Sequence, residues 1–374
     1  MAVSRSDLPS TSFFYNAHVK TWDVIIMGGG IIGLSLAIAL RKRGASVLVV
    51  ERGEPGREAS HAAGGMLADC IVETPTGLQP LASASARMYP EFVHEVENES
   101  GLNVDLRDQG TLLFLPLHDS RDRAEFGATH SLPTPLSELE PAIVDPKLPV
   151  FFLMERSVDP RALTAAALKA ARHRGVDFSS ADPVTAVDLA DGRVTGVTTT
   201  KTTFSAPTVV NCAGAWSGQI PPCAFPTRPV KGQMLCLIAR TLLKHVVRAP
   251  EVYLIPRSDG RVIVGTTVEE AGFDKRTDLA VIQHLHRAAI VLAPELRNAK
   301  ILEDWAGLRP GTPDALPILG ATSKPGYYVA TGHFRDGILL APITAHLMAQ
   351  LIDGSKPEFD LAAFSPARFQ PARV

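Results

Sequence analysis

Few cysteines, a small net charge and the lack of long apolar runs each exclude a class of protein. The four cysteines, Cys70, Cys212, Cys223 and Cys236, form no C-x-x-C pair and no metal-ligand spacing. We therefore expect reduced, mostly buried thiols and no metal site. The net charge of −2 leaves no basic surface for nucleic acid, and no apolar run is long enough to span a membrane. These absences favour a cytoplasmic globular protein of one large or two medium domains.

Residues 1–21 match neither a strand nor a signal peptide. The apolar run 13–15 is too short for a secretory hydrophobic region, and Asp7 and Pro9 precede it. We expect a loose extension before the first strand, with a surface lid or an interface arm as the alternative.

A short apolar run that leads into a glycine turn is the main positive signal. Residues 24–27 predict a buried strand, and Gly28, Gly30 and Gly33 fit the pattern G-x-G-x-x-G. Residues 31–43 then have the apolar period of a helix, and the following glycine is placed to end it. Together these parts predict the strand, turn and helix that begin a doubly wound α/β fold.

Each glycine of the pattern has a physical role in a dinucleotide site. Gly28 allows the tight turn, Gly30 lets the backbone approach a pyrophosphate, and Gly33 lets the helix pack against the strand. The helix N-terminus offers free N–H groups to the phosphates. Residues 45–50 predict a second strand, and Glu51, 21 residues after Gly30, is placed to accept hydrogen bonds from both ribose hydroxyls. The glycine pattern alone admits NAD as well as FAD.

The rest of the chain alternates helical and strand patterns. Asp159 and Pro160 mark a helix start, and Asp191-Gly192 is a typical hairpin turn. After the turn-rich segment 52–67, we expect helices over 78–100, 137–140, 160–173, 277–292 and 338–352, and strands over 109–115, 150–154, 207–211, 232–239, 251–257, 261–267 and 327–331.

This order predicts a Rossmann-like domain built from three separated segments, with a second domain inserted twice. The inserted domain would be an antiparallel sheet with a helix, and it would roof a pocket over the dinucleotide. The predicted boundaries are 1–21 for the extension, 22–104, 155–222 and 303–374 for the FAD-binding domain, and 105–154 and 223–302 for the substrate-binding domain.

Several stretches along the chain together resemble one family. The chain is similar to the FAD-dependent D-amino acid oxidase family, and most closely to glycine oxidases of the thiamine-biosynthesis type. The stretches that carry the resemblance are 28–33, 51–52, 58–60, 63–67, 231–234 (KGQM), 253–257 (YLIPR), 305–310 (WAGLRP) and 332–342 (GHFRDGILLAP).

The resemblance implies a non-covalent FAD across the sheet. Its pyrophosphate would lie at the glycine turn, its ribose on Glu51, its adenine near Val184, and its isoalloxazine ring between 63–66 and 332–338. The helix expected after Gly337 would point at the N1–C2=O edge of the ring and stabilise its reduced form. The implied cofactor-binding residues are Gly28, Gly30, Ile31, Ile32, Gly33, Glu51, Arg52, Ser60, Ala63, Gly64, Gly65, Met66, Val184, Ala213, Gly214, Trp216, Gly332, His333, Phe334, Arg335, Asp336, Gly337 and Ile338.

Three further residues are implied to bind and position a substrate carboxylate. Arginine is the best side chain for bidentate carboxylate binding, which suits Arg309 and Arg335. Tyr253 would be a further contact. The alternatives are ordinary surface arginines and a core tyrosine whose hydroxyl has another partner.

The implied reaction is oxidation of a small amino acid or secondary amine, such as glycine, sarcosine or a small D-amino acid. A hydride would pass from the α-carbon to flavin N5, oxygen would reoxidise the flavin to give hydrogen peroxide, and water would convert the imine to a 2-oxo acid and ammonia. No nucleophile–base pair is required. We expect no nucleic acid partner, and a homo-oligomer, either a dimer or a tetramer, is possible.

Some residues depart from the family pattern. Asp336 replaces a usual asparagine and would pair with Arg335, Asp69 replaces a common proline, and Thr267 replaces a bulky apolar residue on an expected strand. His61 resembles a residue that links covalently to FAD in dimethylglycine and sarcosine dehydrogenases, an alternative that stays open. No cysteine follows Cys236, which argues against a cysteinyl flavin link. A dehydrogenase of D-amino or 2-hydroxy acids with another electron acceptor, and a flavin-binding sensor without turnover, are the competing hypotheses.

Overall fold

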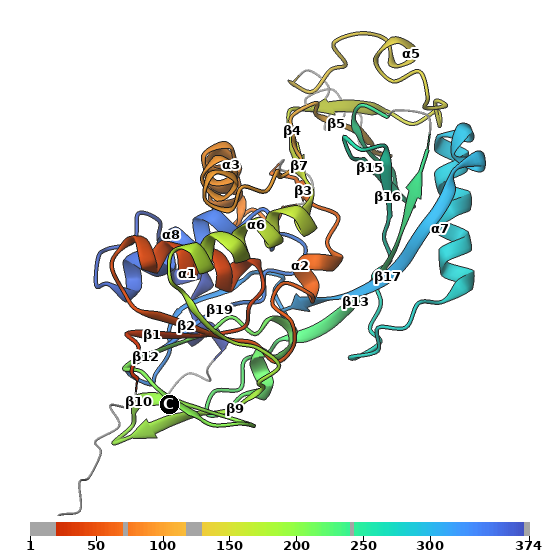
Figure 1. Ribbon diagram of the computed structural model, residues 1–374. Coiled ribbons are helices and arrows are strands. Elements are labelled where there is room, and N and C mark those ends of the chain that lie inside the picture. The colour runs from red at the N-terminus through yellow and green to blue at the C-terminus, as the bar shows by residue number, and fades with distance from the viewer. Residues whose placement is uncertain (1–19, 70–73, 117–128, 240–242, 370–374) are drawn as a thin grey trace, which may run out of the picture.

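The computed structural model describes residues 20–69, 74–116, 129–239 and 243–369. Figure 1 shows two lobes that are joined by the long neighbouring strands β13 and β17. The expectations for residues 1–19 and for Cys70 lie outside the described residues. No helix in these four ranges is long and apolar enough to cross a membrane.

A six-stranded sheet forms the centre of the first lobe. Five strands run parallel, and the edge strand β18 is antiparallel to β19. The order across the sheet is β18 (Ile318–Ala321), β19 (Tyr327–Thr331), β12 (Thr208–Asn211), β1 (Val24–Met27), β2 (Val47–Val50) and β8 (Asp177–Ser179).

Alternation along β1 buries both faces of this sheet. Val24 and Ile26 pack with the helices of one face, whereas Ile25 and Met27 pack with a small antiparallel sheet on the other. Figure 1 shows these helices stacked above β1 and β2, with β9 and β10 below. The helices are α1 (Ile31–Lys42), α3 (Gln79–Ser100), α6 (Pro160–His173) and α8 (Ala341–Ile352), and the small sheet contains β9 (Val184–Ala190), β10 (Arg193–Thr199) and β11 (Thr203–Ser205).

A seven-stranded sheet forms the second lobe. Every neighbouring pair is antiparallel except β14 and β5. The order is β17 (Lys300–Gly311), β13 (Arg228–Ile238), β16 (Arg261–Gly265), β15 (Tyr253–Pro256), β14 (Val246–Arg248), β5 (Thr111–Phe114) and β6 (Val150–Leu153).

The two faces of this sheet have different partners. Leu235 and Leu254 pack with α7 (Leu279–Leu292), which lies along the outer side of the sheet in Figure 1. Met234 and Ile255 pack on the other face with Met66, which belongs to the first lobe. This second face is therefore the one turned toward the dinucleotide side. The remaining elements are α2 (Ala59–Ala62), β3 (Met66–Leu67), β4 (Leu106–Arg107), α5 (Leu136–Leu139), β7 (Arg156–Val158) and the 3-10 helices η1 (Gly214–Gln219), η2 (Pro294–Asn298), η3 (Ala362–Phe364) and η4 (Pro366–Phe369).

The predicted α/β fold class is confirmed, and so are several local signals. Asp159 caps α6 by accepting hydrogen bonds from two backbone N–H groups of its first turn. Asp191 and Gly192 have φ angles of 50° and 78°, as a tight hairpin between β9 and β10 requires. The domain boundaries stay a prediction, and β17 runs across the one placed between residues 302 and 303.

Several element boundaries differ from those expected, and two of them lie next to the site. The helix expected from residue 338 begins at Ala341, because residues 337–340 form turns before it. The strand expected over 261–267 ends at Gly265, so Thr267 lies beyond it.

Candidate active site

The site forms where the parallel strands of the first lobe end. Gly28 follows β1, Glu51 follows β2, Ala213 follows β12 and Gly332 follows β19. Because the carboxyl ends of parallel strands meet at one edge of a sheet, segments from four distant parts of the chain converge there.

The glycine turn after β1 has the geometry that the pattern predicts. Gly28 has φ +109°, and a Cβ there would lie 2.5 Å from the carbonyl oxygen of Cys212. A Cβ on Gly33 would lie 2.1 Å from the carbonyl oxygen of Gly28, so only glycine lets α1 approach β1 so closely. At Gly30 the nearest atom is Ser60 Oγ at 3.2 Å, and α1 begins there without a side-chain cap. The turn is therefore shaped for a group that lies against the helix N-terminus.

Glu51 lies at the end of β2 with 7% of its surface exposed. One carboxylate oxygen accepts from the N–H of Gly29 at 2.8 Å, and the other accepts from the N–H of Gly53 at 2.9 Å. Each carboxylate oxygen has a second lone-pair site, so Glu51 can also accept from a ribose while it holds the turn. Ser60 Oγ accepts from the N–H of Ile31 at 2.9 Å and satisfies one of the free donors of α1.

A cavity of about 780 Å³ runs from this turn to the second lobe. Its volume lies in the range of about 300–1,000 Å³ that is usual for small-molecule and cofactor sites. The predicted residues that line it are Gly28, Gly30, Ile31, Ile32, Glu51, Arg52, Ser60, Ala63, Gly64, Gly65, Met66, Val184, Ala213, Gly214, Trp216, Tyr253, Arg309, His333, Phe334, Arg335, Asp336, Gly337 and Ile338.

Two predicted cofactor residues are not among those that line the cavity. Gly33 lies behind the turn, where it permits the close packing of α1. Gly332 has φ +75°, and a Cβ there would lie 2.5 Å from Thr312 Cγ2. Both glycines shape the backbone of the site and are not part of its wall.

Arg257 holds the stretch that was predicted to contact the flavin ring. It is 3% exposed and donates from Nη2 to the carbonyl oxygen of Gly64 at 2.5 Å. Burial lowers the pKa of Arg257 to about 10, so it keeps its charge at neutral pH. A buried cation therefore fixes the orientation of the peptide at Gly64.

Side chains of α3 hold the turn after β19 through two hydrogen bonds. Tyr89 donates to the carbonyl oxygen of Ile338, and Ser85 donates to that of Leu339 at 2.6 Å. His333 is buried, with Nε2 3.1 Å from Thr344 Oγ1, and burial lowers its pKa to about 3. The imidazole is thus neutral at physiological pH.

An aromatic and charged cluster lies at the nucleotide end of the cavity. The guanidinium of Arg52 lies 3.5 Å from the ring centroid of Trp216, and the ring centroid of Phe273 lies 5.1 Å from that of Trp216. Lys275 pairs with Glu58 at 3.0 Å. The loop between β16 and α7 therefore reaches from the second lobe to residues on the dinucleotide side.

The predicted substrate residues Tyr253 and Arg309 lie on the inner face of the seven-stranded sheet. Tyr253 pairs with Gly265 across β15 and β16, where a Cβ would lie 2.8 Å from the tyrosine ring. Arg309 extends over Gly232, where a Cβ would lie 2.2 Å from Nη1. Neighbouring glycines thus make room for both side chains.

Arg309 has fixed partners in the segment after β16. Its Nη1 donates to the carbonyl oxygen of Thr267 at 3.2 Å, and its Nη2 donates to Thr266 Oγ1 at 3.0 Å. Burial lowers the pKa of Arg309 and raises that of Tyr253, while the charge of each partly offsets the effect on the other. Arginine remains protonated under these conditions. Arg335 is exposed, with its guanidinium carbon 5.4 Å from the ring of Phe334, and adds a second cation to the cavity wall.

The three other departures from the family pattern lie beside the cavity. Thr267, which was expected on a strand, lies beyond β16 and is not among the lining residues. Its Oγ1 donates to Glu269 and accepts from the N–H of Gln233 at 2.9 Å. His61 and Asp69 are not among the lining residues, although their neighbours Ala62 and Ala68 are.

Part of the wall was not predicted from the sequence. These residues come mainly from β13, β17 and the segments that flank β15 and β16, and the glycines among them stand at pairings that cannot be recognised before the strands are aligned. They include Ala62, Thr74, Arg248, Glu251, Gly232, Met234, Gly265, Thr266, Val268 and Gly307.

These features fit an FAD molecule. The cavity has a glycine turn at a helix N-terminus, a buried carboxylate at the end of the second strand, and cations at the opposite end. A model of the family described as DAO, FAD-dependent oxidoreductase, matches residues 23–351. The chain belongs to this family and is an FAD-dependent oxidoreductase.

Particular relatives agree with this assignment. A glycine oxidase of Pseudomonas putida is 32% identical over 360 residues, which are 92% of this chain and 98% of the relative. The crystal structure of glycine oxidase from Geobacillus kaustophilus matches with a TM-score of 0.88 and 30% identity, over 94% of this chain and 100% of that chain. A bifunctional protein ThiO/ThiG of Trichormus variabilis is 35% identical over 94% of this chain. The present chain spans only 55% of that bifunctional relative.

Proposed function

We propose that this protein oxidises a small amino acid or secondary amine, with glycine, sarcosine and small D-amino acids as candidate substrates. The products would be a 2-oxo acid, ammonia or an amine, and hydrogen peroxide. The observation that carries the proposal is the placement of Tyr253, Arg309 and Arg335 in the same cavity as the stretches that resemble an FAD site. The names of the glycine oxidase relatives support it.

The roles of the residues follow from their chemistry. Arg309 and Arg335 would hold the substrate carboxylate, and the hydroxyl of Tyr253 would donate a further hydrogen bond to it. With the carboxylate fixed, the α-carbon of a small substrate is confined near the stretch 63–66. Bound FAD would supply the redox chemistry, with this carbon as the source of a hydride and oxygen as the final electron acceptor. Gly28, Gly30 and Glu51 would hold the dinucleotide part of the cofactor, and residues 332–338 would flank its ring.

Several finer assignments belong to the same proposal. The predicted domains, 22–104, 155–222 and 303–374 for FAD and 105–154 and 223–302 for the substrate, serve as a working assignment within this proposal. A thiamine-pathway role, a cytoplasmic location and a homo-oligomeric assembly remain predictions.

The test is an anaerobic titration of the purified protein, followed by visible absorbance. We expect glycine, sarcosine or a small D-amino acid to bleach the flavin, and air to restore the colour with release of hydrogen peroxide. Arg309→Met should abolish most of this bleaching while FAD remains bound. Bleaching that air does not reverse would instead favour a dehydrogenase with another acceptor. A protein that binds FAD but is bleached by none of these amines would refute the proposed substrates.

A further inference from the structure

We propose that Gln233 and Glu269 are positioning residues that hold Arg309 in the geometry for carboxylate binding. The inference rests on the proposed function, because it takes Arg309 as the carboxylate anchor. It also assigns a role to the stretch KGQM, residues 231–234, which the resemblance singled out and which the cofactor site does not explain.

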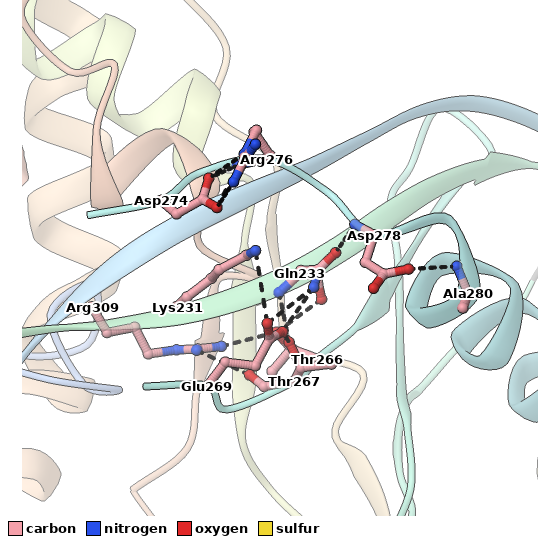
Figure 2. A network of polar contacts seen from close by, with 10 residues as sticks. All are labelled: Lys231, Gln233, Thr266, Thr267, Glu269, Asp274, Arg276, Asp278, Ala280 and Arg309. Atoms are coloured by element: carbon pink, nitrogen blue, oxygen red, sulfur yellow. Dashed lines mark hydrogen bonds and ion pairs between the residues drawn. The ribbon is translucent and has the colours of Figure 1, made fainter. Parts of the chain in front are cut away.

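Arg309 depends on a segment that lies outside regular secondary structure. Arg309 donates hydrogen bonds to Thr266 and Thr267, which follow the last residue of β16. Strand pairing does not include these two residues, so their positions depend on the contacts of their side chains and of the neighbouring Glu269. Figure 2 shows that the contacts come from β13 and from Glu269.

Strand β13 holds this segment at several points. Thr266 Oγ1 donates to the carbonyl oxygen of Gln233 at 3.1 Å, and the N–H of Gln233 donates to Thr267 Oγ1 at 2.9 Å. Thr267 Oγ1 in turn donates to the carboxylate of Glu269. Lys231 and Glu269 exchange two backbone hydrogen bonds, each of 2.9 Å. The groups that accept from Arg309 are therefore tied to one strand.

The side chain of Gln233 has a partner for each of its ends. It is fully buried, and Nε2 lies 2.9 Å and 3.1 Å from the two oxygens of Glu269. Its Oε1 accepts from the N–H of Asp278, the N-cap of α7, at 2.6 Å. Because a backbone N–H can only donate, this contact fixes which end of the amide is oxygen. The amide thus joins Glu269 to the start of α7.

The charges of Lys231, Glu269 and Arg309 together leave one positive charge for a ligand. Lys231 is 6% exposed, and its Nζ lies 3.7 Å from Glu269 Oε2. Glu269 also favours the charged form of Arg309. Lys231 and Glu269 cancel each other, so the positive charge of Arg309 remains for a carboxylate that enters the cavity. A preorganised charge of this kind binds more tightly than one that must first reorient.

The experiment exchanges the amide and the acid in FAD-loaded protein. Gln233→Glu places two carboxylates together, and Glu269→Gln removes the acceptor charge. The double variant Gln233→Glu/Glu269→Gln restores an amide opposite an acid. The carboxylate at position 233 can still accept from the N–H of Asp278, and the amide at position 269 can donate to this carboxylate. Asp274→Asn is the matched control, since Asp274 lies on the same loop and its side-chain hydrogen bonds in Figure 2 go to Arg276.

The readout is the Kd of acetate, measured from the change in the flavin spectrum, together with the Tm and the FAD content of each variant. We expect Gln233→Glu to raise the Kd about 10-fold to 100-fold, in line with a displacement of about 1 Å at the anchor. The double variant should recover at least half of the loss on a logarithmic scale, and Asp274→Asn should match the wild type. With a substrate, the loss should fall on KM more than on kcat.

The outcomes separate this inference from the proposed function. If the wild type binds acetate and Gln233→Glu binds it equally well, the positioning role is refuted. A double variant no better than Gln233→Glu alone would also refute it, because the loss would then not come from the Gln233–Glu269 pair. If wild-type protein loaded with FAD does not bind acetate, Arg309 is not a carboxylate anchor and both proposals fail. Acetate binding without oxidation of any amine would refute the proposed substrates only.

Discussion

Gly232 offers the sharpest test of the geometry around Arg309. A Cβ at this position would lie 2.2 Å from Nη1, 2.6 Å from Nη2 and 2.7 Å from Cζ of Arg309. Ordinary van der Waals contact begins at 3.4 Å, so Gly232→Ala would displace the guanidinium by about 1.2 Å, the difference between 3.4 and 2.2 Å. The hydrogen bonds to Thr266 and Thr267 would not survive this shift unchanged.

The expected loss is in ligand binding and not in folding. A displacement of about 1 Å at a positioning group can cost up to about 100-fold in activity, which is about 2.7 kcal/mol. Gly232 lies in a strand without a left-handed φ, so alanine fits its backbone and even removes some freedom from the unfolded chain. That effect is worth about 0.4–1 kcal/mol in favour of folding. Stability should therefore change by less than about 1 kcal/mol while binding falls steeply.

The assay compares kcat/KM for the substrate, the Kd of acetate and the free energy of unfolding in urea. Gly77→Ala is the control, because Gly77 is exposed, has no left-handed φ and has no atom within 4 Å of the point that a Cβ would occupy. A Gly232→Ala protein that binds acetate with wild-type affinity would refute the placement of Arg309. A variant that is unfolded would show that the crowding is relieved by the strand and not by the flexible side chain.

Three further predictions concern single residues. Asp336→Asn removes a negative charge next to Arg335 and should lower the KM for a carboxylate substrate by up to about 5-fold. The effect should shrink in high salt because Arg335 is exposed. An equal effect on KM at all salt concentrations would contradict this prediction. Glu51→Gln replaces one carboxylate oxygen by an NH2 group, which would face the backbone N–H of Gly29 or of Gly53. Because two donors cannot bond to each other, the Kd of FAD should rise about 10-fold or more, as measured by flavin fluorescence. An unchanged Kd would show that the carboxylate is dispensable. Burial lowers the pKa of folded His333 from 6.5 to about 3, so between these values the unfolded chain binds more protons and stability falls as pH falls, by up to about 1.4 kcal/mol per pH unit. His333→Asn should show a shallower loss in urea unfolding between pH 7 and 4, and parallel curves would contradict the assignment.

Local signals in the sequence were reliable where a conformation depends on a few neighbouring residues. The turn at Gly28, the hairpin at Asp191-Gly192 and the cap at Asp159 each follow from the stereochemistry of one or two side chains. The position of Glu51 at the end of β2 could be counted directly from the glycine turn.

Boundaries next to the site were less predictable because tertiary contacts set them. Apolar periodicity continues from Ile338 into α8, yet the helix begins only at Ala341. The carbonyl oxygens before it are taken by Tyr89 and Ser85, which come from a helix far away in the sequence. Such a contact leaves no trace in the local pattern.

The sequence by itself determined the class of protein, the dinucleotide turn and the types of residue that would bind a carboxylate. Only the tertiary structure decided what supports those residues, because Arg309, Gly232 and the Gln233–Glu269 pair meet through strand register and through a segment beyond β16. Glycine and glutamine at these positions carry no local signal. Gly232 is required by the space that the arginine of another strand occupies, and Gln233 by the carboxylate of Glu269, 36 residues away. Pairing between distant strands is a property of the folded sheet, and it is there that the binding geometry is set.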